Sequence, residues 1–405
     1  MQLMPTHARR RFALITAACA VLANCLAVAQ AQSVAPADAS ESASGKLSVK
    51  AAIDAAAYAD TDHVYVLTPV LSGSVSKPTA GWSIGGQYLV DAVSAASVDI
   101  VSTASRHWQE LRHAGGLNAS YKPGERGGAV NASVSSEPDY LSISGGLSAT
   151  QDLLDQNLTL SLGYQHGHDV AGRSGTPFDV FSRVLDRDSV KASCTVVLDR
   201  ATLALFVLDS VFEHGDPSKP YRYVPLFAPG TQVPKGASVD EVNRARVSAR
   251  PLEQLPLTRS RFALSFGVLH RFDAATLRVD ERVYADSWAL LATTTDARYL
   301  FDWGPFELGP HVRLHAQSAV SFWKRVYELR PALDLPALRT GDRELSPLLA
   351  GTLGWTLRWR LGPAGERDRY RLGLDINATE TRYLDTLYIT RRLSAYSNLS
   401  FEAQL

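Results

Sequence analysis

The sequence predicts an all-β protein, an antiparallel transmembrane β-barrel of about 16 strands, with roughly 12–16 as the acceptable range. Three observations support this fold class. Many segments of about ten residues alternate between apolar and polar side chains. Turn-forming residues separate these segments, and no segment after the N-terminal region has about 18 uninterrupted apolar residues, the length needed for a transmembrane helix.

The alternation is clearest between residues 261 and 318. In 259–271 the alternate positions include Phe262, Leu264 and Phe266, and residues 274–286 continue the pattern with charged side chains on the other face. Successive side chains of a strand point to opposite faces, so each segment presents one face to lipid and the other to water. Glu281 fits neither face, which predicts a bulge or a register shift there.

The N-terminal residues 1–31 have the pattern of a secretory signal peptide. Arg9, Arg10 and Arg11 precede an apolar run, and Ala29-Gln30-Ala31 offers a cleavage site. Residues 32–45 are rich in Ala and Ser and predict a flexible leader, which leaves 46–405 for the barrel.

Charge and cysteine content exclude several classes of protein. Lys and Arg number 41, as do Asp and Glu, so no basic surplus supports nucleic-acid binding. Of the three cysteines only Cys194 lies beyond the signal peptide, so no intrachain disulfide is expected. Cys194 alternates with apolar residues and is interpreted as a small residue of the barrel wall.

The predicted loops differ in length in a regular way. Long segments at 169–186, 214–258 and 319–344 follow odd-numbered strands, and tight turns follow even-numbered ones. Barrels have short periplasmic turns and long outer loops, so the long segments are expected outside the cell. The seven prolines in 214–258 indicate that this segment contains no regular element. Residues 91–105 are expected to form a short helix or a loop folded into the lumen. The predicted strands cover 47–59, 64–75, 82–90, 106–121, 128–136, 139–150, 158–165, 187–199, 201–213, 259–271, 274–286, 290–302, 306–318, 345–361, 368–378 and 395–405.

Three segments carry a resemblance to a known family. They are Val283-Tyr284-Ala285-Asp286-Ser287-Trp288, His311 to Ala319 with Arg313 and Gln317-Ser318-Ala319, and Asp91 to Ser105. They resemble a family of uncharacterised bacterial outer-membrane β-barrel proteins known only as a domain of unknown function. The resemblance covers most of the chain beyond residue 31, and implies architecture and location without catalytic residues.

The charged faces of the later strands supply the candidate functional residues. They predict an ion-selective pore wall, or equally a paired polar network that plugs the barrel. The residues expected to line the lumen are Arg278, Asp280, Arg282, Asp286, His311, Arg313, His315, Gln317, Arg358, Arg360, Arg369 and Arg371.

Other chemistry has weaker support. His166 and His168 have a spacing that could bind a metal ion, but no third ligand is specified. Ser265, His315 and Asp280 could form a hydrolytic site, but no nucleophile-elbow motif flanks a serine. The sequence therefore predicts no enzyme, no catalytic or metal-binding residue and no cofactor.

The expected protein is an outer-membrane barrel of a Gram-negative cell that works as a channel, transporter or export accessory. Its expected partners are the lipid bilayer, the barrel-assembly machinery and a small solute. The alternative is a structural or adhesive surface protein that binds partners through loops 169–186, 214–258 and 319–344. An outer-membrane hydrolase is the least favoured hypothesis.

Overall fold

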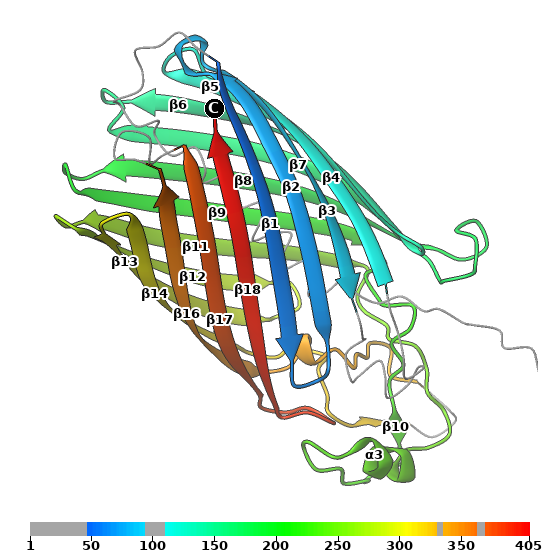
Figure 1. Ribbon diagram of the computed structural model, residues 1–405. Helices are drawn as coiled ribbons and strands as arrows, with labels where there is room; N and C mark the ends of the chain where they lie inside the picture. Colours follow the sequence, from blue (N-terminus) through cyan, green and yellow to red (C-terminus); the bar gives the residue numbers. More distant parts are fainter. Residues whose placement is uncertain (1–46, 94–109, 330–334, 363–368) are drawn as a thin grey trace, which may run out of the picture.

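The chain folds into a closed antiparallel barrel of sixteen strands (Figure 1). The structure is a computed structural model that describes residues 47–93, 110–329, 335–362 and 369–405. It confirms the predicted fold class and strand number. The barrel strands are β1 (Ser48–Asp60), β2 (Tyr65–Lys77), β3 (Trp82–Val93), β4 (Glu110–Tyr121), β5 (Arg126–Glu137), β6 (Tyr140–Leu153), β7 (Leu158–Ala171), β8 (Arg183–Val197), β9 (Thr202–Gly215), β11 (Thr258–Arg271), β12 (Ala275–Asp286), β13 (Leu291–Trp303), β14 (Phe306–Gln317), β16 (Leu348–Leu361), β17 (Tyr370–Tyr383) and β18 (Arg391–Gln404).

The barrel closes by pairing its first strand with its last. β1 pairs with β18 in a continuous register from Lys50 opposite Gln404 to Asp60 opposite Ser394. Every other barrel strand pairs with its neighbours in chain order. Closure satisfies the backbone hydrogen bonds of both edges, which a sheet inside a lipid bilayer requires.

Large apolar side chains cover the outer wall. Leu264 is 57% exposed, Phe266 42% and Leu353 68%, as expected for residues that face lipid. Cys194 lies half-buried on the same surface, between apolar neighbours on β7 and β9. A surface with this many exposed hydrophobic side chains would be unfavourable in water, whereas contact with lipid is favourable for it. The protein is therefore an integral protein of the outer membrane.

Aromatic side chains collect on the outer wall near the ends of the strands that meet in short turns. The Trp303 and Phe306 ring centroids lie 6.2 Å apart, and Phe306 lies 5.8 Å from Trp359. Tyr370 stacks on Phe401 at 6.2 Å. Tyrosine and tryptophan favour the membrane–water interface, so these rings mark one boundary of the bilayer.

Glu281 differs from the prediction of a bulge or shifted register. β12 pairs without interruption with both neighbours, and Glu281 lies opposite Phe266 on β11 and Thr295 on β13. Its carboxylate faces outward and accepts hydrogen bonds from the hydroxyls of Thr293 and Thr295. Local hydroxyl donors let an acidic residue remain on the apolar face, so no change of register is needed.

The long described connections all lie at one end of the barrel, together with the short turns after β1, β5 and β12, whereas the described turns at the other end are all short (Figure 1). The long connections between β7 and β8, β9 and β11, and β14 and β16 are all at the same end as the turn between β17 and β18. The first of them spans 172–182 and is shorter than the predicted 169–186, because the alternation of β7 and β8 continues to Ala171 and Arg183. No described helix has the length and apolar character needed to cross a bilayer.

The long connections fold together into a cap, which we define as residues 216–257, 318–329, 335–347 and 384–390. The expectation that 214–258 holds no regular element is wrong. The two-residue strand β10 (Leu226–Phe227) pairs in parallel with β15 (Tyr327–Glu328). Helix α3 (Val239–Ala245) begins at a capping box formed by Ser238 and Glu241. The prolines flank this helix rather than interrupt it. Short 3₁₀ turns are η1 (Pro78–Ala80) and, within the cap, η3 (Arg343–Leu345).

Buried apolar side chains hold the cap together. Phe227, Val233, Ala237 and Val242 form one cluster, which packs the helix against the short strand β10. A second cluster, with Leu255, Trp288, Leu290, Val320 and Leu345, joins the cap to the turn between β12 and β13. The cap is thus a packed structure anchored on the rim of the barrel. The predicted signal peptide (1–31), the predicted leader (32–45) and residues 94–105 of the third family-like segment lie outside the described residues.

The cap offers a test of the orientation in the membrane. Lys235 is exposed between Pro234 and Gly236, whereas most of the segment around β10 is buried. We expect trypsin added to intact cells to cut after Lys235 before it cuts any barrel strand, since folded strands in lipid resist proteolysis. Mass spectrometry of the fragments identifies the site. Cleavage that needs a permeabilised outer membrane would place the cap in the periplasm.

Candidate functional site

The predicted lumen-lining residues lie on the inward faces of four strands, β12, β14, β16 and β17, with Arg369 just before β17. Their alternation with exposed residues such as Val283, Leu314 and Leu353 fixes this direction. Arg358, Arg360, Arg369 and Arg371 lie toward the end with short turns, and Asp286 and Gln317 lie at the cap end. The remaining six residues lie between these two groups.

Several of these arginines are neutralised by carboxylates in the wall. Arg278 Nε lies 2.6 Å from Asp280 on the same strand. Arg358 lies 3.2 Å from Glu307, and Arg360 lies 3.2 Å from Asp302. Arg371 lies opposite Glu402 in the β17–β18 register. This part of the wall is therefore a ladder of paired charges, as expected where an isolated charge would be costly.

His311 on β14 makes polar contacts with residues of two other strands, one on each side of β14. Its Nε2 lies 2.8 Å from Asp296 on β13, and its Nδ1 lies 3.0 Å from the Asn377 Oδ1 on β17. The second contact passes over Gly354, where an added Cβ would lie 2.0 Å from the Asn377 oxygen. Glycine is needed here to let the imidazole reach across β16.

His315 and Gln317 are also held in place by hydrogen bonds. His315 Nδ1 lies 2.8 Å from the Thr294 hydroxyl, and its Nε2 lies 3.3 Å from the Gln317 Oε1. The Gln317 amide donates hydrogen bonds to the carbonyl oxygens of Glu344 at 2.8 Å and Ser346 at 2.9 Å. These two residues join the barrel wall to the cap.

Arg282 and Arg313 differ from their neighbours. Both side chains are exposed, and in the described part of the chain neither has an ion-pair or hydrogen-bond partner. Arg313 lies opposite Asp296 in the register, but that carboxylate is engaged by Arg298 and His311. The two guanidinium groups therefore leave an uncompensated positive charge on the inward face of β12 and β14.

At mid-height, the opposite wall of the barrel carries mostly small, uncharged side chains. Strands β2–β7 lie across the lumen from β12–β16 in the barrel order. Hydroxyls there bond to one another, as between Ser133 and Ser144 at 2.8 Å. Among the described residues, the side chains of this wall are shorter than those of the charged wall. The inward residues of this wall include Ser72, Ser74, Gly85, Gln87, Gly116, Asn118, Asn131, Ser133, Ser142, Ser144 and Ser148.

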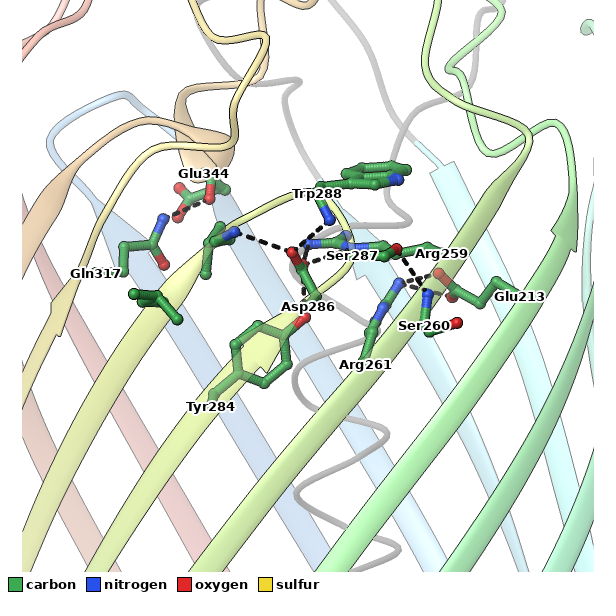
Figure 2. A network of polar contacts seen from close by, with 12 residues as sticks. Glu213, Arg259, Ser260, Arg261, Tyr284, Asp286, Ser287, Trp288, Gln317 and Glu344 are labelled. Carbon is green, nitrogen blue, oxygen red and sulfur yellow. Dashed lines mark hydrogen bonds and ion pairs between the residues drawn. The ribbon is translucent and has the colours of Figure 1, made fainter.

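Asp286 organises the rim of the barrel at the cap end (Figure 2). Its carboxylate accepts hydrogen bonds from Arg259 at 2.8 Å, the Tyr284 hydroxyl at 2.9 Å and the backbone N–H groups of Trp288 and Leu290 at 2.9 and 3.0 Å. Arg259 also stacks over the Trp288 ring at 4.1 Å. The segment from Tyr284 to Trp288, which carries part of the family resemblance, is thus a structural turn that shapes the rim.

A second ion pair lies beside this turn. Arg261 Nη2 contacts both carboxylate oxygens of Glu213 at 2.6 Å, joining β11 to β9 (Figure 2). Farther around the rim, Arg343 of the cap lies 2.7 Å from Asp62 in the β1–β2 turn. Tyr221 of the cap donates a 2.7 Å hydrogen bond to Asp139 between β5 and β6. Polar contacts therefore hold the cap at points far apart on the rim.

The interior of the cap contains a buried charge network. Glu253 is fully buried and accepts hydrogen bonds from the Lys219 backbone N–H at 3.1 Å and from the Thr340 hydroxyl. Arg222 Nη1 bridges Glu253 at 3.4 Å and Asp342 at 2.7 Å. Burial raises the pKa of Glu253, and burial together with the nearby charge of Arg222 lowers the pKa of Lys219 to about 8. Glu253 and Arg222 are almost completely buried, so water has little access to the pair.

The structure does not assemble the other candidate sites from the sequence. His166 and His168 face outward and lie 2.9 Å from Asp188 and 2.6 Å from Asp186, respectively. The described residues contain no group of three His, Cys, Asp or Glu side chains that could hold a metal ion. His315 bonds to Thr294 and Gln317, and among the described residues no hydrogen bond links it to Ser265 or Asp280.

The sequence reasoning missed the cap network and the neutral lumen wall. Arg222, Glu253 and Asp342 are separated by long irregular segments, and no spacing indicates that they meet. The neutral wall did have a signal, since serine, glycine and asparagine recur at alternate positions of β5 and β6.

Solved structures with a similar fold are distant in sequence. CdiB from Acinetobacter baumannii has 9% identity and a TM-score of 0.49, covering 88% of this chain and 60% of that chain. OccK7 (OpdD) from Pseudomonas aeruginosa has 9% identity and a TM-score of 0.45, covering 90% and 99%. A bacterial polysaccharide outer membrane secretin has 9% identity and a TM-score of 0.45, covering 89% and 99%. These similarities are too distant to transfer a function.

The sequence comparisons agree with the resemblance noted above. No curated protein matches the sequence. The family described as "Protein of unknown function (DUF3570)" matches residues 104–376, which is more than half of the 405-residue chain. The chain therefore belongs to this family.

Proposed function

We propose that the protein is a water-filled channel through which small anions cross the outer membrane. The observation that supports this proposal is the pair of exposed arginines, Arg282 and Arg313, on a wall where most neighbouring cations are paired with carboxylates. Uncompensated charge next to a low-dielectric wall attracts ions of the opposite sign and repels those of the same sign. The neutral wall opposite leaves space for the ion and its water.

The alternative to a channel is a barrel plugged by its own polar side chains. The small residues on β2–β7 argue against a plug formed by the described wall itself, because their side chains are too short to meet the charged wall. The cap supports a second candidate function, binding of a ligand at the outer mouth. Insertion by the barrel-assembly machinery, which an outer-membrane barrel needs, also remains part of this proposal.

Current through single proteins in a planar bilayer tests the proposal. We expect the purified full chain to conduct in KCl, with a reversal potential in a salt gradient that indicates a preference for chloride. Arg382 and Arg391 lie exposed on the outer wall, where they share Glu380, so replacing both with glutamine should leave the reversal potential unchanged. A protein that inserts but never conducts would contradict the channel and support the plugged barrel.

A further inference from the structure

The outer wall of the barrel carries two adjacent arginines at the cap end. Arg382 is the penultimate residue of β17, and Arg391, the first residue of β18, lies opposite it in the register. Their side chains are 67% and 65% exposed. On the described strands they are the only lysine or arginine residues at outward positions of the cap end. Basic charge on this part of the lipid-facing wall is therefore confined to one place.

Glu380 joins the two guanidinium groups without saturating them. Its Oε1 lies 2.7 Å from Arg382 Nε and 3.1 Å from Arg391 Nε, and its Oε2 accepts a 3.3 Å hydrogen bond from Arg391 Nη2. Among the described residues, Glu380 is the only partner of either guanidinium. A guanidinium has five N–H donors, so most of the donors remain free, and the three side chains together keep one positive charge. The group therefore has both the charge and the donors to bind a further anion.

The two arginines lie at the depth of lipid headgroups. Tyr370, which stacks on Phe401, marks the bilayer boundary at the other end of β17. Arg382 follows Tyr370 by twelve residues in the same strand. With a rise of about 3.4 Å per residue and a tilt of about 40°, the two residues lie about 31 Å apart along the bilayer normal. The apolar band of such barrels is about 25 Å tall, so Arg382 and Arg391 lie just beyond the acyl chains.

Apolar side chains surround the arginines on the same face of the wall. Leu349 on β16 lies opposite Arg382 and is 46% exposed. Leu393 on β18 lies opposite Glu380 and is 48% exposed. Acyl chains can contact these leucines while a headgroup reaches the guanidinium groups. Arginine binds phosphate through parallel charge-assisted hydrogen bonds, which makes phosphate the headgroup anion that fits this pair best.

We propose that Arg382 and Arg391 together bind the anionic phosphate of a lipid headgroup in the leaflet on the cap side. Their free N–H groups donate to the phosphate oxygens, and the acyl chains lie against Leu349 and Leu393. The site faces lipid rather than the lumen, so it does not depend on conduction.

A second copy of the chain is the other anionic partner to consider. Asp186 and Asp188 face outward on β8, about halfway around the barrel from β17 and β18. Asp186 lies 2.6 Å from His168, and Asp188 lies 2.9 Å from His166. Because both carboxylates already have partners within one chain, the lipid phosphate is the favoured partner of the arginines.

Native mass spectrometry of the purified full chain in detergent tests the site. The probes are dioleoyl phosphatidic acid and dioleoylglycerol, which have the same acyl chains and differ in the phosphate. We expect one tightly bound phosphatidic acid and much weaker binding of dioleoylglycerol. Arg382→Gln with Arg391→Gln should weaken the affinity for phosphatidic acid roughly ten-fold to a hundred-fold, as expected for the loss of charge-assisted hydrogen bonds. The matched control is Lys77→Gln with Arg126→Gln, which removes two outward cations at the other end of the wall, on strands that are not neighbours, and should leave the affinity unchanged.

Glu380→Gln tests which charge holds the lipid. It removes the carboxylate that competes with the phosphate, so phosphatidic acid should bind at least as well as before. Loss of binding in this variant would mean that the carboxylate holds the lipid through a metal ion, and would overturn the arginine site.

Other results would also overturn the proposal. They are unchanged binding in the double arginine variant, an equal loss in the control, displacement of the lipid by an equal concentration of inorganic phosphate, and an arginine-dependent dimer in place of bound lipid. The double arginine variant is expected to lose the lipid and keep the reversal potential of the channel, so this proposal and the channel can fail separately.

Discussion

Replacing both Arg282 and Arg313 with glutamate is expected to move the reversal potential of the channel from anion preference to cation preference. Neither guanidinium group has a carboxylate partner among the described residues, so the change reverses a charge that solutes would meet directly in the proposed channel. At an effective dielectric constant of about 20 and a distance of about 10 Å, one unit charge changes the energy of an ion by roughly 1.7 kcal/mol, or more than ten-fold in ion preference. Two reversed charges should therefore dominate the selectivity.

The matched variant is Arg282→Lys with Arg313→Lys, which keeps both charges and should keep the anion preference. Measurements in a KCl gradient at low and high salt add a second check, since screening should reduce the difference between the variants. A glutamate variant that conducts with unchanged selectivity would show that these arginines do not line the pathway.

The second large effect concerns the outer wall. Leu264→Arg places a charge near the middle of β11 on the lipid-facing surface, where Leu264 is 57% exposed. We expect the free energy of unfolding in lipid vesicles to fall by about 2–4 kcal/mol, the usual cost of arginine near the bilayer midplane. Denaturant titration followed by tryptophan fluorescence measures the loss.

Asn131→Arg is the control for this substitution. Asn131 is exposed on the inward face of β5, opposite Asn118 and Gly146, so in the proposed water-filled channel an arginine there would stay in water. We expect its unfolding free energy to change far less than that of Leu264→Arg. Equal losses in the two variants would mean that the faces are assigned the wrong way round or that the lumen is dry.

The barrel could be predicted from the sequence because its physical cause is periodic. A strand between lipid and water must alternate, and most residue pairs of β11 and β12 do so, although Leu269 lies on the inward face, and His270 and Glu281 lie on the outward face. Glu281 is the charged exception. There the sequence alone could not reveal that Thr293 and Thr295 supply hydroxyls from the next strand. The cap could not be predicted, since its contacts join distant irregular segments and follow no period.

The sequence predicted which strand face carries the candidate residues, but not which of them form ion pairs. Alternation places Arg278, Arg282 and Arg313 on the inward wall, yet it does not say which of them finds a carboxylate. That depends on details such as Asp296 binding His311 rather than Arg313, and on Gly354 allowing His311 to reach Asn377. Charge compensation is a property of the assembled wall, so only the structure separates paired from unpaired arginines.

The two unlike walls of the barrel have a consequence for how a solute would travel. Arg282 and Arg313 on β12 and β14 face hydroxyl and amide groups on β3–β6, so in the proposed channel the field of these two charges at mid-height points across the barrel rather than along it. A molecule with charge at one end and hydroxyl groups at the other would turn in this field, with its negative end toward β12 and β14. Two isomers of equal size and net charge, differing only in where the charge is attached, should then pass at different rates.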